Sequence, residues 1–127
     1  MPKFELSSGP HGTREVFEHL KICASGMYTD NYESICKGIA KRTRNQVNIN
    51  HRGVGKQLGY LRSQCIDHQV PWINALAVGT NWGTPQEWRP SDGFLPRSVS
   101  WKPSFEHLWR GMVLQVFSYD WTQISIV

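Results

Sequence analysis

Three stretches in the first half of the chain carry apolar residues at the spacing of an amphipathic helix. This spacing gathers the apolar side chains on one face, which must be buried against another element. We therefore expect helices over about 13–25, 30–41 and 51–68. Their expected buried faces are Val16, Phe17, Leu20 and Ala24 in the first helix, Tyr32, Ile35, Cys36 and Ile39 in the second, and Val54, Leu58, Leu61 and Cys65 in the third.

Residues that begin or end helices flank these repeats. Thr13 can cap the first helix with its hydroxyl, and Gly26 stands in the usual C-terminal stop position. Asp30 followed by Glu33 resembles a capping box at the start of the second helix. The stretch 43–50 is polar and turn-prone, so it predicts the connection to the third helix.

The second half of the chain has fewer regular features. Pro71 cannot continue a helix, and the apolar run 73–78 after it is typical of a buried strand. Residues 79–104 contain four Pro, three Gly and three Trp without clear periodicity, which predicts a long Trp-rich loop. Ser104 can cap a C-terminal helix. The β-branched and aromatic residues of 113–121 favour a closing strand or an extended tail.

Length and composition indicate a single domain, 1–127, that is mainly α with a small β component. The chain has 127 residues, of which 39% are hydrophobic, so it can bury one core. No apolar run approaches the roughly 18 residues of a membrane span, and the N-terminus lacks the apolar centre of a signal peptide. The three Cys form no CxxC pair. We therefore expect a cytoplasmic protein with reduced thiols and no membrane partner.

Positive charge is concentrated in one segment. Between Ser34 and Ile66 lie seven Lys and Arg and no Asp or Glu, although the formal net charge of the whole chain is only +4. A one-sided positive field attracts polyanions, so we expect binding to DNA, with duplex DNA as the favoured form. A solvated helix face is the alternative. The expected DNA contacts are Lys37, Lys41, Arg42, Arg44, Arg52, Lys56 and Arg62.

The sequence contains none of the common motifs for metal binding, nucleotide binding or catalysis. Its five His are scattered without the short paired spacing of a metal site, and no Gly-rich loop opens a helix after a strand. Its close acidic pairs, Glu15 with Glu18 and Asp30 with Glu33, are explained as helix-surface and capping residues. We therefore expect no metal, no cofactor and no catalytic residue. A small nuclease with an unrecognised site remains as the enzymatic alternative.

Three short motifs occur in an order found in a known DNA-binding family. They are "YESICKGIA" from Tyr32, "RGVGKQLG" from Arg52 and "VPWINALAV" from Val70. In this order they resemble the winged-helix DNA-binding domain of the alkylguanine-DNA alkyltransferases and, more closely, their non-enzymatic alkyltransferase-like relatives. The resemblance covers roughly 28–85. It implies a winged-helix-like core over these residues, beside the Trp-rich loop and the C-terminal helix.

The resemblance also implies roles for single residues. Tyr32 would act at the 3′ phosphate of a flipped nucleotide, and Arg52 would enter the stack where the base had been. Trp72, which follows Pro71, would lie in the pocket for the modified base. Because Trp72 stands where the enzymes have their alkyl-accepting Cys, and Cys65 is no substitute, there is no thiolate to attack a lesion. The implied function is non-catalytic DNA binding that senses a modified or flipped base.

Other interpretations stay open. Trp82, Trp88 and Trp101 could stack on unpaired bases, cover the core, or form the contact surface of a protein-interaction or inhibitory module. The Pro71–Trp72 pair is also typical of a plain turn with a core aromatic. A second resemblance, through "VPWINALAV" and "VFSYDW", is to small uncharacterised bacterial proteins, and it implies no activity.

Overall fold

A computed structural model of the protein describes residues 3–6, 12–79, 89–91, 94–96 and 98–126. The described part is mainly helical, with a small β component, as expected. Its elements, in chain order, are β1 (Lys3–Phe4), α1 (Thr13–Gly26), β2 (Asp30–Asn31), α2 (Tyr32–Arg42), α3 (His51–Asp67), the 3-10 helix η1 (Ile73–Leu76), β3 (Ala77–Gly79), β4 (Arg89–Pro90), the 3-10 helix η4 (Pro103–Phe105), α4 (Glu106–Ser118), the 3-10 helix η5 (Trp121–Gln123) and β5 (Ser125–Ile126).

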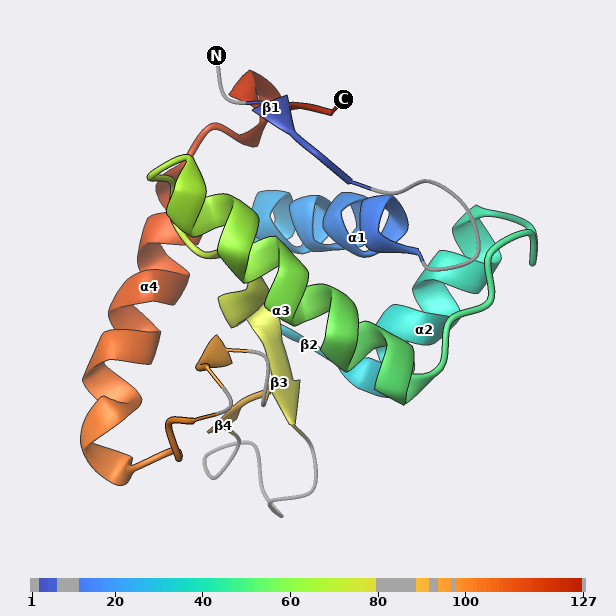
Figure 1. The fold of residues 1–127 in the computed structure, drawn as a ribbon. Helices are drawn as coiled ribbons and strands as arrows, with labels where there is room; N and C mark the ends of the chain where they lie inside the picture. The colour runs from blue at the N-terminus through green and yellow to red at the C-terminus, as the bar shows by residue number, and fades with distance from the viewer. Residues whose placement is uncertain (1–2, 7–11, 80–88, 92–93, 97, 127) are drawn as a thin grey trace.

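Helix α3 crosses the front of the molecule in Figure 1, with α1 behind it and with α2 and α4 on opposite sides. A three-stranded sheet has the order β2-β3-β4, in which β2 and β3 are parallel and β3 and β4 are antiparallel. A separate parallel pair, β1 with β5, brings the two ends of the chain side by side (Figure 1).

The main core lies between α1, α2 and α3, and the helical repeats in the sequence predicted it well. The expected faces of α1 and α3 are buried throughout, and Ile35 and Ile39 of α2 are fully buried. Tyr32 and Cys36 are only partly buried and pack against the edge of the same core. The apolar periodicity therefore identified which side of each helix faces inward.

A second, smaller core lies between η1, β3 and α4. It is formed by Ala75, Val78, Phe94 and Trp109. The Trp109 indole N–H donates a hydrogen bond of 2.9 Å to the Ala75 carbonyl oxygen, so this buried polar group has a partner. This contact joins the C-terminal helix to the turn that follows α3.

The expectation of a strand or extended tail over 113–121 is wrong, because α4 continues through Ser118. The spacing of Trp109, Met112 and Val116 explains this result. These residues recur at helical intervals, and all three contact the two cores. Tertiary burial of this face outweighs the strand preference of the β-branched residues. The expected strand over 73–78 is also shorter, since residues 73–76 form η1 and only Ala77–Gly79 are extended.

Two helix ends differ from expectation because the predicted capping groups have other partners. The Thr13 hydroxyl donates to the Gln57 side chain of α3, so the residue before it, Gly12, occupies the N-cap position of α1. The Asp30 carboxylate lies against His19, and the neighbouring Asn31 caps α2 by accepting from the Ser34 amide. Contacts with other elements thus engage both predicted capping residues, and the cap position moves to Gly12 in α1 and to Asn31 in α2.

The other two differences occur at the C-terminus of α1 and the N-terminus of α4. Gly26 is still helical, and Met27 takes the left-handed C-cap conformation with φ of 58°. A Cβ on Gly26 would collide with the Tyr28 ring in its present position. Helix α4 begins after η4 rather than at a Ser104 cap, and Phe105 occupies the N-cap position without a side-chain hydrogen bond.

Among the described residues, no helix is both long and apolar enough to cross a membrane. Part of the expected winged-helix-like core, residues 80–85, lies outside the described residues. The same holds for Trp82 and Trp88 in the Trp-rich loop.

Candidate nucleic-acid interface, apolar pocket and His–Cys–Asp cluster

The connection between α2 and α3 is a tight turn organised by Thr43. Its hydroxyl donates to the Ile39 carbonyl oxygen at 2.8 Å and accepts from the Val47 amide at 3.1 Å. Arg44 and Asn45 follow with φ of 53° and 63°, a left-handed conformation that Asn tolerates well. The Asn45 amide then bonds back to the last turn of α2 at Ala40. This turn leaves Arg44 exposed at the corner of the two helices.

Helix α3 presents one polar face to solvent from its first turn onward. Asn50 caps it by accepting a hydrogen bond of 2.7 Å from the Gly53 amide. Arg52, Lys56 and Tyr60 follow at intervals of four residues, and all three are exposed. Because the opposite face is fully buried, this arrangement aims the exposed stripe away from the core.

Three of the seven expected DNA-contacting cations are already engaged or partly covered. Lys37 lies 2.9 Å from Glu33, and Arg42 lies 2.6 Å from Glu15 of α1. The seven-cation segment contains no acid of its own, so both carboxylates come from outside it. Arg62 is half-buried, with Nε and Nη1 shielded from solvent. These three side chains therefore present less net positive charge to a phosphate than the sequence suggests.

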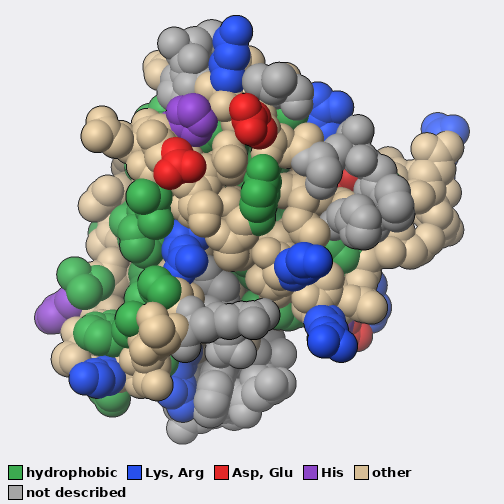
Figure 2. Space-filling model, in the orientation of Figure 1, with side chains coloured by type: hydrophobic (Ala, Val, Ile, Leu, Met, Phe, Trp, Pro, Cys, Tyr) green, Lys and Arg blue, Asp and Glu red, His purple; other side chains and the backbone are tan. Residues whose placement is uncertain are grey.

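The four remaining cations are exposed and form the surface that we call the basic face: Lys41, Arg44, Arg52 and Lys56. No carboxylate of the described residues lies within ion-pair distance of any of them. Figure 2 shows Lys and Arg side chains spread over the front of the molecule where α3 crosses it. The acidic side chain of α3, Asp67, is at its other end.

Tyr32, expected to act at a phosphate, lies beside the first turns of α3. Its ring is 6.3 Å from the His51 ring, and a Cβ on Gly55 would lie 3.7 Å from the Tyr32 hydroxyl. The structure thus brings Tyr32 to the same end of α3 as Arg52. Both residues lie at the margin of the basic face.

The other expected pocket residues, Pro71 and Trp72, lie at the far end of α3. The Val70 amide donates to the carbonyl oxygen of Cys65, which is in the last turn of the helix. Arg52 is in the first turn, and a helix of 17 residues is about 25 Å long. The structure does not bring Arg52 and Trp72 together, although the flipped-base arrangement requires both at one nucleotide.

Trp72 does line a pocket, of about 370 Å³, between the turn after α3 and helix α4. The Trp72 ring packs 5.8 Å from the Phe94 ring, and its backbone N–H donates to the Met112 sulfur at 3.2 Å. The pocket is mostly apolar, and among the described residues its only polar side chains are His107 and Gln115. The described residues that line it are Trp72, Phe94, Leu95, Phe105, His107, Leu108, Gly111, Met112 and Gln115.

Trp101, the one Trp of the long loop that is described, is half-buried. It packs against the second core and meets the Phe105 ring edge-on at 6.1 Å. Of the roles considered for this residue, the structure supports covering the core. Trp82 and Trp88 lie outside the described residues.

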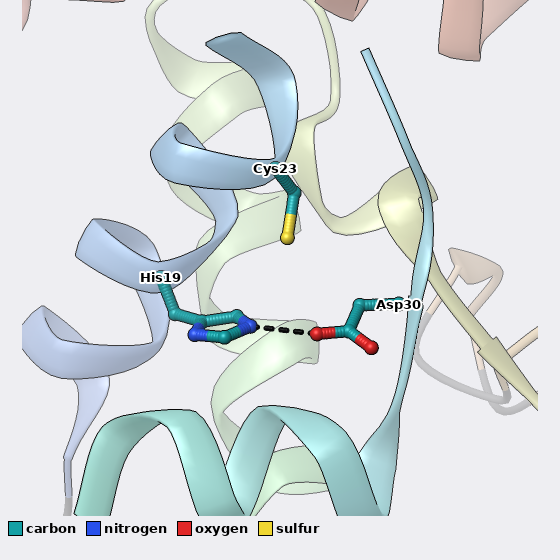
Figure 3. Close-up of side chains that lie close together, drawn as sticks. All are labelled: His19, Cys23 and Asp30. Atoms are coloured by element: carbon teal, nitrogen blue, oxygen red, sulfur yellow. Dashed lines mark hydrogen bonds and ion pairs between the residues drawn. The ribbon is translucent and has the colours of Figure 1, made fainter. Parts of the chain in front are cut away.

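The structure also brings together three side chains that we did not predict as a site: His19, Cys23 and Asp30 (Figure 3). His19 and Cys23 are one turn apart on α1, and Asp30 belongs to β2. Nε2 of His19 lies 2.8 Å from Oδ2 of Asp30. One ligand atom from each residue, including Cys23 Sγ, lies within 4.8 Å of the other two.

Burial controls the protonation of this cluster. It raises the pKa of the Cys23 thiol to about 12, with a further contribution from the Asp30 charge, so the thiol is neutral at physiological pH. Burial alone would also raise the pKa of Asp30. Hydrogen bonds to His19, Ser34 and the Asn31 amide outweigh burial and hold that pKa below its usual value. The cluster therefore pairs an ionised carboxylate with a protonated thiol.

The sequence carried one signal for this cluster, which our search for paired metal ligands overlooked: the spacing of four between His19 and Cys23 within a predicted helix. Two residues at that spacing share a helix face, and metal sites use it. The third member could not be found in this way, because Asp30 reaches the cluster only through the packing of β2 against α1.

No family model matches this chain, and no curated protein or solved structure shows significant similarity to it.

Proposed function

We propose that this chain binds duplex DNA through the basic face and catalyses no reaction. The observation that carries the proposal is the set of four exposed cations, Lys41, Arg44, Arg52 and Lys56, without a carboxylate partner among the described residues. They lie on adjoining elements, the end of α2, the turn after it and the first turns of α3. A duplex could therefore contact them together.

The orientation of α3 supports the same proposal. A helix N-terminus carries partial positive charge, which adds to the charge of Arg52 and Lys56 in the first two turns. Because the cations precede Asp67 at the other end, a phosphate chain is attracted to the N-terminal half of the helix. Entry of this half into the major groove, whose width accepts one helix, would place Arg52 and Lys56 beside phosphates or base edges.

The proposal differs in one respect from what the alkyltransferase-like resemblance implied. Tyr32 and Arg52 stay at the DNA, but Trp72 does not, because it lies near the opposite end of a helix about 25 Å long. The pocket beside Trp72 also offers few polar groups to read the edge of a base. We therefore propose binding to intact duplex, without extrusion of a base.

The test compares two double variants with the same loss of charge. Arg52→Gln with Lys56→Gln removes half of the basic face, whereas Lys3→Gln with Lys102→Gln removes two exposed cations outside it that likewise have no carboxylate partner among the described residues. Fluorescence anisotropy with a labelled duplex should show a loss of affinity of about tenfold per phosphate contact at 0.1 M salt for the first variant. The second should bind like the wild type. Equal losses in both variants, or no binding by the wild type, would overturn the proposal.

The apolar pocket favours a second candidate function, capture of an apolar side chain of a partner protein. Leu108 at its rim is 68% exposed, and a pocket of this volume is in the usual range for ligand sites. A Cβ on Gly111 would enter open space, so Gly111→Leu should fill the pocket without disturbing the core. Loss of binding of a fluorescent apolar dye in this variant would support the candidate, whereas unchanged dye binding would exclude the pocket.

A further inference from the structure

We propose that His19, Cys23 and Asp30 form a binding site for one divalent transition-metal ion of the zinc type. This site is separate from the basic face and does not depend on DNA binding. Imidazole nitrogen, thiolate sulfur and carboxylate oxygen are the three ligand classes that zinc uses in proteins. The three residues supply one of each.

The three ligand atoms converge closely enough for one ion to reach all of them. They lie within 4.8 Å of one another, and His19 Nε2 and Asp30 Oδ2 are 2.8 Å apart. Ligands of a tetrahedral zinc ion lie about 3.3–3.8 Å apart. A rotation of the Cys23 side chain that moves Sγ inward by about 1 Å, with a slight opening of the His19–Asp30 contact, produces this spacing. Water can complete the coordination, since the Asp30 side chain is 13% exposed.

The orientation of the imidazole distinguishes a metal site from a cysteine-based catalytic triad. In a triad, one ring nitrogen faces the nucleophile and the other faces the acid. Here the nitrogen of His19 that meets Asp30 is also the one directed towards Cys23, as Figure 3 shows. A single nitrogen shared by both partners suits an ion lying between the three groups. The raised pKa of Cys23 also argues against a nucleophile acting alone.

The surroundings hold the ligands in place. A Cβ on Gly38 of α2 would lie 2.5 Å from Cε1 and 2.8 Å from Nδ1 of His19, so the glycine leaves room for the ring. The Asn31 amide donates to Asp30 Oδ1 at 2.9 Å and holds the carboxylate in place. Outer contacts of this kind orient ligands in known metal sites.

Binding of the ion is balanced by the loss of one proton. The S–H bond of Cys23 breaks as the sulfur–metal bond forms, and the proton passes to a buffer base. The Asp30 carboxylate is already ionised at neutral pH. In the free protein Nε2 of His19 donates to the Asp30 carboxylate, so its proton must leave Nε2 before this atom binds the ion, and it moves through solvent to Nδ1, which carries the single N–H of the metal-bound ring. No group is oxidised or reduced. The bound ion would join α1 to β2, and β2 leads directly into α2.

The test uses the whole chain, reduced and stripped of metal with a chelator, and then titrated with Co²⁺ or Zn²⁺. We expect one equivalent of Zn²⁺ to remain after desalting and Co²⁺ to produce a thiolate-to-cobalt charge-transfer band. Cys23→Ser and Asp30→Asn should each weaken binding more than about 100-fold, beyond what loss of an outer-shell partner costs. Cys36→Ser is the matched control, because it removes a thiol outside the cluster and should leave binding unchanged.

A second measurement keeps the test decisive if a ligand variant fails to fold. In the wild type, Zn²⁺ should slow alkylation of Cys23, read by mass spectrometry of its peptide, without slowing that of Cys36. No retained metal, no protection of Cys23, or binding that survives Cys23→Ser in a folded protein would overturn the proposal. The last result would assign the metal to exposed groups such as His51 and His107.

Discussion

The salt dependence of DNA binding measures how many cations contact phosphates. The sequence and the structure predict different numbers of such contacts. The sequence contains seven candidate cations. In the structure two of them are paired with carboxylates and a third is partly buried, so four remain exposed and unpaired among the described residues. A cation already paired with a carboxylate presents no net charge to a phosphate, so it releases no counterion on binding. The expected number of contacts is therefore four.

The expected magnitude follows from counterion release. Each phosphate contact contributes about 0.9 to the slope of log affinity against log salt, so four contacts predict a slope of about −3.6. Between 50 and 200 mM salt the affinity should then fall about 150-fold. Seven contacts would predict a fall of about 6,000-fold over the same range. When Arg52 and Lys56 are both replaced, two contacts remain, and the affinity should fall only about 12-fold over the same salt range.

Fluorescence anisotropy at four or more salt concentrations would measure both slopes, with the Lys3→Gln, Lys102→Gln double variant as the control for general charge loss. A wild-type slope of about −6.3 would refute the reasoning, because it would mean that Lys37, Arg42 and Arg62 also contact phosphates. An unchanged slope in the Arg52, Lys56 double variant would equally refute it, since the contacts would then lie elsewhere on the molecule.

Four further predictions concern the free energy of unfolding, measured by urea titration. Gly59→Ala should raise it by about 0.5–1 kcal/mol, because the added Cβ meets nothing within 4 Å and a helix-interior glycine is entropically costly. Gly38→Ala should lower it instead, because its Cβ would collide with the His19 ring at 2.5 Å, and a gain in stability would contradict this contact. Met27→Gly should raise it by up to about 1 kcal/mol, because Met27 occupies a left-handed C-cap that glycine adopts without strain, and a loss would contradict the C-cap assignment. Burial raises the pKa of Cys65 from 9.0 to about 12, so its contribution is complete below pH 9 and should fall by about 1.4 kcal/mol per pH unit from there to pH 12. Cys65→Ala should therefore be less stable at pH 7 yet lose less stability in alkali, and an equal alkaline loss would argue against a buried thiol.

The first three long helices could be predicted from the sequence because their signals are local. Apolar residues at intervals of three and four, such as Val54, Leu58 and Leu61, specify both the helix and its buried face. The polar stretch between α2 and α3 likewise predicted a turn, which Thr43 organises through contacts within four residues. Interactions between residues close in sequence are present whatever the rest of the chain does.

Prediction failed where a residue had both a local and a distant partner. Thr13 has the chemistry of an N-cap, yet its hydroxyl bonds Gln57, which is 44 residues away. The segment 113–118 has the composition of a strand, yet it is helical, because Val116 and its neighbours are buried against the two cores. Local preferences are worth fractions of a kcal/mol per residue and yield to burial of this kind.

For function, the sequence alone determined that half of the Lys and Arg residues lie in about one quarter of the chain, with no Asp or Glu among them. Only the tertiary structure decided which charges remain available, since Arg42 meets Glu15 from a different helix. It also separated Arg52 from Trp72 and assembled His19, Cys23 and Asp30 from two elements. Composition and periodicity describe the charge and the apolar face of each segment. A site depends on the distances between side chains of different segments, and these distances are set only when the core packs the segments together.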